Sequence, residues 1–323
     1  MSITLQDIEA AAARIAPHAV VTPLLSSPAL AAATGAAVVY LKPEMLQVCG
    51  AFKFRGAMNR LARLTPAQLH AGVVAFSSGN HAQGVAIAAA KVGCPAVIVI
   101  PSDAPRIKIE ATRAAGAEIR LYDRYTESRE EISAQIAAER GAVVAPAFDD
   151  PDIIAGQGTL GLEIAAQAVG GPLDVVLCPV GGGGLIAGTS LALKSRMPAC
   201  HIYGVEPEGF DDTRRSLAAG ARLGIEAGGQ TLCDALMAPA PGVLTFAINK
   251  KTLSGVFTVT DEEVKAAMRF AFLKLKLVVE PGGSVGLAAL LAGKLDVAGK
   301  RVGIVLSGGN VDPDQFAQIL RET

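Results

Sequence analysis

The chain has no tryptophan, only 4% aromatic residues and almost no excess of charge of either sign. Its 323 residues include 29 lysines and arginines and 30 aspartates and glutamates, which give a formal net charge of −1. That balance argues against a nucleic-acid partner, because binding to phosphates needs a basic excess. Apolar runs are short and strand-sized, such as residues 302–306, whereas a membrane helix needs roughly 20 apolar residues. No membrane association is therefore expected.

Cysteine motifs and a leader segment are also missing. Five cysteines stand at wide spacing without a Cys-x-x-Cys, so the sequence predicts neither a zinc site nor a disulfide framework. The start of the chain shows neither the basic segment nor the long apolar core of a secretory signal. We therefore expect a cytoplasmic protein with reduced thiols.

Glycine, in contrast, is in excess, with 35 of 323 residues, or about 11%, against a usual share of roughly 7%. With 51% hydrophobic and 18% charged residues, the composition excludes disorder. A chain rich in alanine and glycine and poor in aromatic residues predicts helices packed closely on a parallel sheet. The length suggests two domains, at roughly 100–200 residues each.

Strand and helix patterns alternate along the chain. A helix is expected over residues 4–15 with Thr4 as its cap, followed by a strand over 38–41. Further on, the pattern predicts strands at 73–76, 96–100, 118–121 and 142–145, with helices at 80–92, 106–115 and 128–140. A second series predicts strands at 175–179, 201–205 and 301–306, with helices at 185–194 and 262–274. Short connections then imply parallel α/β sheets with helices on both faces, while residues 206–258 show no clear pattern.

Four segments at or near strand ends carry candidate chemistry, because ligands of parallel sheets bind at the carboxyl ends of strands. A glycine run between a strand and a helix offers converging N–H groups for a phosphate, with a tight turn as the alternative; it consists of Gly181, Gly182, Gly183 and Gly184. The run lacks the acidic partner of a dinucleotide site and the lysine of a P-loop. Residues 77–81 (Ser-Ser-Gly-Asn-His) stand at another such junction and suit a carboxylate, or simply cap the helix.

The other two segments contain a lysine and a serine. Lys53 stands between Phe52 and Phe54, a setting that would desolvate the amine, lower its pKa and suit a Schiff base. An ordinary surface lysine on a helix is the alternative. Residues 307–310 (Ser-Gly-Gly-Asn) follow the last strand and offer a hydroxyl and a glycine-rich turn, or a turn alone.

Taken in this order, the four segments resemble the fold-type II pyridoxal-phosphate enzymes, in particular the serine/threonine dehydratase and serine racemase family. The resemblance covers nearly the whole chain and extends to Lys42-Pro43-Glu44 with Gln47, to residues 155–159 (Ala-Gly-Gln-Gly-Thr) and to residues 279–283 (Val-Glu-Pro-Gly-Gly). It implies an α/β fold of the tryptophan synthase β type, built from two parallel-sheet domains with the cofactor between them. We expect a small domain of residues 72–148 and a large domain of residues 1–71 with 149–323.

The resemblance also implies roles for single residues. Lys53 would form the Schiff base with pyridoxal 5'-phosphate and take the α-proton of the substrate. The other cofactor contacts would be Phe52 on the ring, Asn80 on the ring hydroxyl, Ser307 on the ring nitrogen, and Gly181, Gly182, Gly183 and Gly184 on the phosphate. The substrate carboxylate would lie on Ser77, Ser78, Asn80 and His81, and Ser78 matches the opposite-face acid/base of the racemases. Arg129 matches an arginine that reaches the substrate site in serine racemase, with a solvated charge at a helix start as the alternative.

A divalent cation and a second copy of the chain are implied in the same way. Glu206, Asp212 and the carbonyl of Phe210 are hard oxygen ligands that suit Mg²⁺, Ca²⁺ or Mn²⁺, with an acidic surface loop as the alternative. The ion would be structural and lie near the cofactor loop. The family also implies a homodimer.

The activity implied by the resemblance is a dehydratase that converts L-threonine and L-serine to a 2-oxo acid and ammonia by β-elimination. Three departures from the family pattern concern the substrate: Ala51 stands where serine is common, Ala235 where glycine is usual, and Phe148 where a polar residue or tyrosine is found. Because Gly-Ala-Phe-Lys also occurs in relatives acting on 3-hydroxyaspartate, that substrate is an alternative, as is racemisation of serine through Ser78. The alternative from another class is a dinucleotide-binding or phosphate-sensing module without catalysis.

Overall fold

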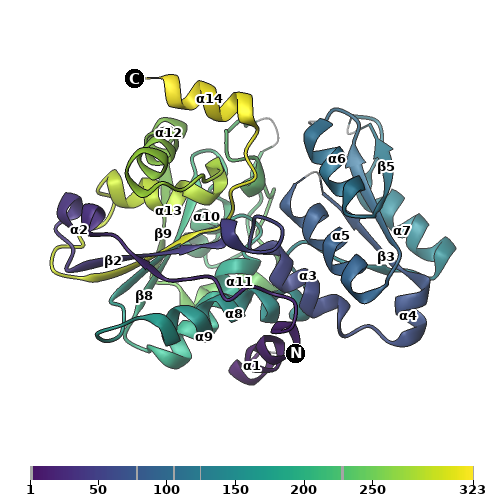
Figure 1. Cartoon of the computed structure of the whole chain (residues 1–323), viewed down its shortest axis with the longest axis horizontal. Helices are drawn as coiled ribbons and strands as arrows, with labels where there is room; N and C mark the ends of the chain where they lie inside the picture. The colour runs from purple at the N-terminus through teal and green to yellow at the C-terminus, as the bar shows by residue number, and fades with distance from the viewer. Residues whose placement is uncertain (1–2, 78, 105, 124, 227–228, 323) are drawn as a thin grey trace.

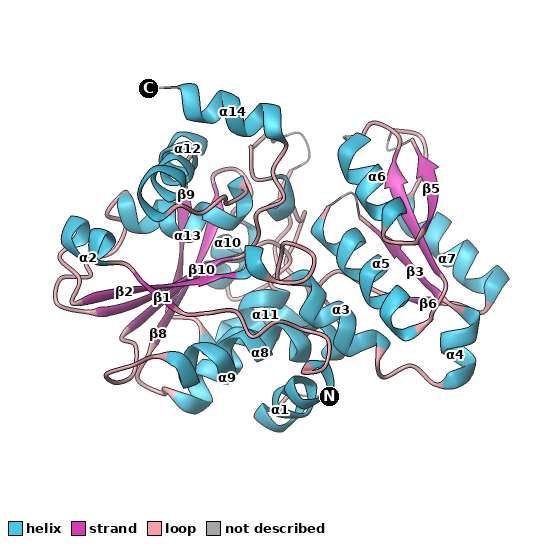
Figure 2. Ribbon diagram, in the orientation of Figure 1, coloured by secondary structure: helices cyan, strands magenta, loops and turns pink. Residues whose placement is uncertain are grey.

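Two sheets form the frame of the molecule (Figures 1 and 2). The computed structural model describes residues 3–77, 79–104, 106–123, 125–226 and 229–322. The large sheet has the order β1-β2-β10-β7-β8-β9, with β1 Leu25–Ser26, β2 Val38–Pro43, β7 Val175–Pro179, β8 His201–Pro207, β9 Gly255–Val259 and β10 Arg301–Leu306. The small sheet has the order β5-β4-β3-β6, with β3 Val73–Phe76, β4 Ala96–Pro101, β5 Glu118–Tyr122 and β6 Val143–Val144. Among these described strands only β1 and β2 pair antiparallel, so the expected parallel α/β fold is confirmed.

Helices cover both faces of the large sheet, and its strands are apolar on both faces as a result. Val302 and Ile304 of β10 pack toward α12 (Asp261–Phe270) and α13 (Pro281–Leu291). Val305 points the other way, toward α8 (Pro151–Gln167) and α9 (Gly184–Arg196), because successive side chains of a strand alternate between faces. The remaining helices on this side of the molecule are α1 Leu5–Ile15, α2 Pro28–Thr34, α10 Asp212–Ala219, α11 Val243–Thr252 and α14 Pro313–Arg321.

The small sheet is covered in the same way. Ile98 and Ile100 of β4 pack toward α5 (Asn80–Val92) and α3 (Lys53–Leu61), whereas Val97 and Val99 pack toward α7 (Arg129–Arg140). Two further helices, α4 (Pro66–Ala71) and α6 (Arg106–Ala114), complete this part of the fold. Helix α3 contacts both α5 and α8 and therefore connects the two sheets (Figure 1).

Most elements predicted from the sequence are present within two residues of the predicted ends. Thr4 caps α1 and exchanges hydrogen bonds with Asp7, as the sequence predicts. The prediction of one helix over 262–274 is wrong at its end: α12 stops at Phe270, a π-helical turn (Ala271–Leu275) follows, and Lys276 at φ 60° ends the segment in the left-handed region. Residues 206–258, which showed no pattern, contain α10, α11 and all of β9 except its last residue, Val259.

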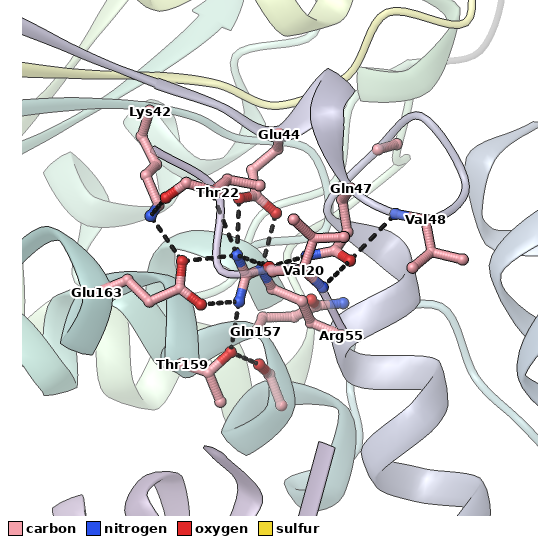
Figure 3. Close-up of polar contacts among 12 residues, drawn as sticks. Val20, Thr22, Lys42, Glu44, Gln47, Val48, Arg55, Gln157, Thr159 and Glu163 are labelled. Atoms are coloured by element: carbon pink, nitrogen blue, oxygen red, sulfur yellow. Dashed lines mark hydrogen bonds and ion pairs between the residues drawn. The ribbon is translucent and has the colours of Figure 1, made fainter. Parts of the chain in front are cut away.

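Three buried charged side chains, Lys42, Glu44 and Arg55, form a cluster of ion pairs near the start of α3 with the partly buried Glu163 (Figure 3). Arg55 is only 1% exposed, and its guanidinium contacts the carboxylates of Glu44 and Glu163 at 2.6–2.9 Å. Lys42, fully buried, donates to Glu163 at 2.6 Å and to the carbonyl of Thr22 at 2.7 Å. The two positive and two negative side chains come from β2, the turn after it, α3 and α8. The Lys42-Pro43-Glu44 motif therefore has a structural role in this protein.

The predicted division into domains at residues 72 and 149 stays a prediction, although all four strands of the small sheet lie between these positions. None of the helices in the described part of the chain is long and apolar enough to cross a membrane.

Candidate active site

A cavity of about 230 Å³ lies where β3, β7 and β10 end. It brings together all but one of the cofactor and substrate residues singled out from the sequence, namely Phe52, Lys53, Ser77, Asn80, His81, Arg129, Gly181, Gly182, Gly183, Gly184 and Ser307. Ser78 lies outside the described residues. Segments that were ambiguous one at a time thus converge on one site, at the sheet ends where parallel folds bind their ligands.

Lys53 is the first residue of α3 and extends into this cavity. Its Nζ donates to the carbonyl of Ala147 at 2.9 Å and lies 5.1 Å from the ring centre of Phe52. Burial lowers the pKa of Lys53 to about 8, against a weaker opposing effect of Cys49 and Glu280. An appreciable share of neutral amine is therefore present near neutral pH, which an ordinary surface lysine would not provide.

The four-glycine loop (residues 181–184) connects β7 to the N-terminus of α9. Gly183 has φ +91°, and a Cβ there would lie 2.9 Å from the Asn249 amide nitrogen. A Cβ on Gly182 would overlap the ring of Phe148. The Gly182 carbonyl is held from outside the cavity by the hydroxyl of Thr245 at 2.7 Å. Side chains are thus excluded where the backbone and a helix N-terminus meet, an arrangement that fits a phosphate.

Phe52 and Ser307 are fixed to each other by the backbone. Ser307 directly follows β10 and is 3% exposed, and its carbonyl accepts the N–H of Phe52 at 3.0 Å. A neutral hydroxyl and an aromatic ring therefore line the same cavity, and together they could contact the nitrogen and the face of a pyridine ring.

Asn80 and His81 begin α5 and are both buried. The Nδ2 of Asn80 donates to Glu280 Oε1 at 2.6 Å. The Nε2 of His81 lies 2.9 Å from the carbonyl of Ala145, which can only accept, so Nε2 carries the hydrogen. Burial, with the nearby Lys53, lowers the pKa of His81 to about 3. His81 is therefore neutral at physiological pH.

Arg129 is the first residue of α7 and reaches the cavity wall. Its guanidinium carbon lies 5.2 Å from the ring centre of Phe76, and its Nε is 2.9 Å from a carboxylate oxygen of Glu130. The side chain is 44% exposed. Both sequence interpretations describe part of this: the charge stands at a helix start, and it also borders the cavity.

Glu206 and Asp212, proposed as metal ligands with the Phe210 carbonyl, lie away from the cavity lining, between β8 and α10. The Glu206 carboxylate accepts the N–H groups of Thr213 and Arg214 at 2.9 and 3.0 Å. Both Asp212 carboxylate oxygens are buried without a hydrogen-bond partner among the described residues. Burial raises the pKa of Glu206 to about 8 and that of Asp212 to about 7, and the charge of Asp212 adds to the first effect.

Two buried carboxylates, of which Asp212 has both oxygens without a hydrogen-bond partner among the described residues, fit a hard cation but do not show one. No group of three or more His, Cys, Asp or Glu side chains suited to a metal occurs in the part of the chain that the structure describes. The metal site stays a prediction.

Sequence reasoning missed several residues of the site. Glu280 stands in the quoted 279–283 motif but had no role, and Phe76 lines the cavity next to Arg129. The Asp149 carboxylate accepts three N–H groups at the start of α11, two at Oδ1 and one at Oδ2, and so holds Thr245 in place next to the glycine loop. No sequence signal connects positions 94–96 residues apart.

Comparison with known proteins agrees with this geometry. A family model described as pyridoxal-phosphate dependent enzyme matches residues 15–308. The L-threo-3-hydroxyaspartate ammonia-lyase of Pseudomonas sp. is 45% identical over 315 residues, or 98% of each chain. The L-threonine ammonia-lyase of Thermotoga maritima is 43% identical over 320 residues, 99% of this chain and 79% of its own. The structure of maize serine racemase superposes with a TM-score of 0.93 at 38% identity, covering 98% of this chain and 97% of its own.

The chain therefore belongs to the pyridoxal-phosphate dependent enzymes of fold type II, in the group of the serine/threonine dehydratases and serine racemases. Within that group it is a pyridoxal-phosphate dependent ammonia-lyase of hydroxy amino acids.

Proposed function

We propose that the substrate is 3-hydroxyaspartate, which the enzyme converts to oxaloacetate and ammonia. The place of Arg129 carries the proposal: its guanidinium lies on the cavity wall, where the second carboxylate of that substrate can pair with it. The relative of Pseudomonas sp. named for this activity supports the same choice.

The residues of the cavity fit the cofactor. The glycine loop would hold the phosphate, Asn80 the ring hydroxyl, Ser307 the ring nitrogen and Phe52 the ring face, with Lys53 as the amine that binds it. When bound, pyridoxal phosphate takes up electrons from the α-carbon of the amino acid.

The protein side of the reaction is proton transfer and substrate orientation. With a pKa near 8, the Lys53 Nζ takes the α-proton as a neutral amine. Ser77 and the N-terminal end of α5, where His81 is the second residue, orient the α-carboxylate through a hydroxyl and backbone N–H groups. A serine at position 307 stabilises a protonated ring nitrogen less than an aspartate would, which favours rapid loss of the β-hydroxyl.

L-Threonine and L-serine are the second candidate substrates. The contact of Arg129 with Glu130 favours them, because it offsets part of the charge that a substrate carboxylate would meet. Racemisation of serine depends on Ser78, which lies outside the described residues, and stays an alternative tested by chiral analysis of the serine left after incubation.

Substitution of Arg129 separates the two candidates. We expect R129M to lower kcat/KM for 3-hydroxyaspartate by roughly 100-fold or more and for threonine by less than about threefold, because only the first substrate loses a charged hydrogen bond. R129K keeps the charge but not the planar guanidinium, so its kcat/KM for 3-hydroxyaspartate should lie between those of the wild type and R129M. A wild-type enzyme that prefers threonine by several orders of magnitude, or an R129M variant that loses both activities equally, contradicts the proposal.

A structural cation, a homodimer and a cytoplasmic location complete the proposal. Glu206, Asp212 and the Phe210 carbonyl would hold Mg²⁺, Ca²⁺ or Mn²⁺ through oxygen atoms. Exposed apolar side chains near the π-helical turn, Phe272, Leu273 and Val278, support a surface between two copies, which light scattering of the purified protein tests. All five cysteines are buried and free, which suits a reducing compartment.

A further inference from the structure

Three hydrogen bonds form a directional chain that ends in the cavity. Asn310 lies in the turn after β10, and its Nδ2 donates to the carbonyl of Cys49 and to Oδ1 of Asn80, both at 2.8 Å. The Nδ2 of Asn80 in turn donates to Glu280 Oε1 at 2.6 Å. Asn80 and Glu280 line the cavity, whereas Asn310 is not among its lining residues.

The chemistry of the two ends fixes the direction of this chain. The Cys49 carbonyl can only accept a hydrogen bond, so Asn310 must direct its Nδ2 toward it. The second hydrogen of that nitrogen is then aimed at Asn80 and requires an oxygen there. At the other end, Glu280 accepts the hydrogen bond of the Asn80 Nδ2 at its Oε1. If the Asn80 amide were flipped, its Nδ2 would face the Nδ2 of Asn310, and its Oδ1 would face the carboxylate of Glu280. Both hydrogen bonds would then be lost.

Room for Asn310 is built into the neighbouring turn. Gly50 has φ +70°, and a Cβ at this position would lie 2.5 Å from the Asn310 Oδ1. The N–H of Gly309 donates to the Gly50 carbonyl at 3.0 Å and ties the two turns together. The Asn310 amide is thus held by backbone on the side away from Asn80.

We propose that Asn310 is a positioning residue that keeps the Nδ2 of Asn80 directed into the cavity. The inference rests on the proposed contact of Asn80 with the ring hydroxyl of the cofactor. The Asn80 Nδ2 carries a second hydrogen besides the one bound to Glu280, and a hydroxyl or phenolate oxygen accepts it only in this amide orientation. Asn310 acts on the cofactor through Asn80 alone.

Two substitutions of Asn310 distinguish this role from a general structural one. N310A removes the donor and leaves the bond to Glu280 as the one contact of this chain that still orients the Asn80 amide. N310D replaces the donor with an acceptor of similar size, which attracts the Asn80 Nδ2 and favours the flipped amide. We expect the dissociation constant of pyridoxal phosphate from the apo-protein to rise about threefold to tenfold in N310A and several times further in N310D. Absorbance titration of the apo-proteins with the cofactor measures this without any turnover.

The double variant N80A/N310D tests whether the effect passes through Asn80. On the N80A background, N310D should add less than about twofold to the dissociation constant, because no amide remains to be turned. The matched control is N59A, which removes a buried asparagine of α3 whose Nδ2 donates to the Asp152 carbonyl at 2.6 Å. N59A should lower the melting temperature of the apo-protein and leave the dissociation constant unchanged.

The outcomes separate the inference from the proposed role of Asn80. If N80A binds the cofactor as the wild type does, the proposed contact of Asn80 is wrong and the inference falls with it. If N80A weakens binding but N310D does not, only the role of Asn310 is wrong. The role of Asn310 is also wrong if N310A and N310D raise the dissociation constant equally and in proportion to their loss of melting temperature.

Discussion

The Arg129 guanidinium lies over the ring of Phe76, 5.2 Å from its centre, while Glu130 holds its Nε from the adjacent position of α7. The ring positions the cation at the cavity wall, and the carboxylate competes with any acidic substrate for it. These two neighbours should therefore act on substrate binding in opposite directions.

We expect F76L to raise KM for 3-hydroxyaspartate about threefold to tenfold, because a cation–π contact is worth roughly 0.5–2 kcal/mol. E130Q should lower the same KM by up to about fivefold, since an exposed ion pair is worth roughly 0–1 kcal/mol and its loss frees the guanidinium. Steady-state kinetics with 3-hydroxyaspartate and threonine measures both. E110Q, which breaks the exposed Glu110–Arg113 pair, is the control. If KM for 3-hydroxyaspartate changed in the same direction in F76L and E130Q, Phe76 and Glu130 would not act on Arg129 in opposite directions.

The pKa of Lys53 predicts how the apo-protein takes up its cofactor. Burial lowers this pKa from 10.5 to about 8, and only the neutral amine attacks an aldehyde. The rate of cofactor incorporation should therefore rise about tenfold per pH unit below pH 8 and level off above it, as followed by stopped-flow absorbance. K53R supplies the unreactive baseline. A rate that continues to rise toward pH 10.5 would mean that Lys53 titrates like an exposed lysine.

The same shift affects stability with a defined sign. The folded pKa of Lys53 lies below the unfolded value, so between about pH 8 and 10.5 the unfolded chain binds more protons at this position. The free energy of unfolding of the apo-protein, relative to K53M, should rise with pH across that range. Urea unfolding at several pH values measures the difference, and a flat difference would contradict the shift.

Ala235 predicts a change of side-chain preference. It lines the cavity, and its methyl group lies 3.3 Å from the place where a Cβ of Gly282 would stand. A235G removes one methyl group from the wall, so kcat/KM for threonine relative to serine should rise by roughly 10-fold, the usual effect of one methylene. An unchanged ratio would mean that the substrate side chain points elsewhere.

Removal of divalent cations should lower stability if Asp212 holds an ion. The two oxygens of Asp212 lack partners among the described residues, and a bound cation would compensate their burial. We expect EDTA to lower the melting temperature by several degrees and Mg²⁺ to restore it, with no response in D212N. D211N is the matched control, because Asp211 pairs with Arg214 instead. A wild-type melting temperature that is insensitive to EDTA and Mg²⁺ would remove the predicted site.

The sequence predicted the sheets well because their strands are short apolar runs followed by glycine or helix signals. It failed at α8, where Gly156, Gly158 and Gly161 make the helix propensity poor. In the fold these glycines are required by packing: a Cβ on Gly156 would lie 2.7 Å from the Gly56 Cα, and one on Gly161 would lie 2.6 Å from the Thr189 carbonyl. Such contacts between distant helices leave no local signal.

The active site follows the same division. Lys53, the glycine loop and Ser307 each follow or precede an element that the sequence predicts, so their convergence could be expected once the sheets were placed. The residues that hold these groups in place could not be predicted from the sequence. Asn310 is 230 positions from Asn80 and 261 positions from Cys49, and Asn80 is 200 positions from Glu280. Hydrogen bonds between such distant positions depend on how the two sheets meet.

The glycine contact between α3 and α8 has a consequence for redesign. Where backbone touches backbone, no side chain remains that could be exchanged to move one helix against the other. The position of α3, which carries Lys53, is therefore set by backbone contacts, whereas Phe76, Arg129 and Ala235 line the cavity from three other segments. New substrate ranges should be sought by varying these three residues, with the glycines between α3 and α8 left unchanged.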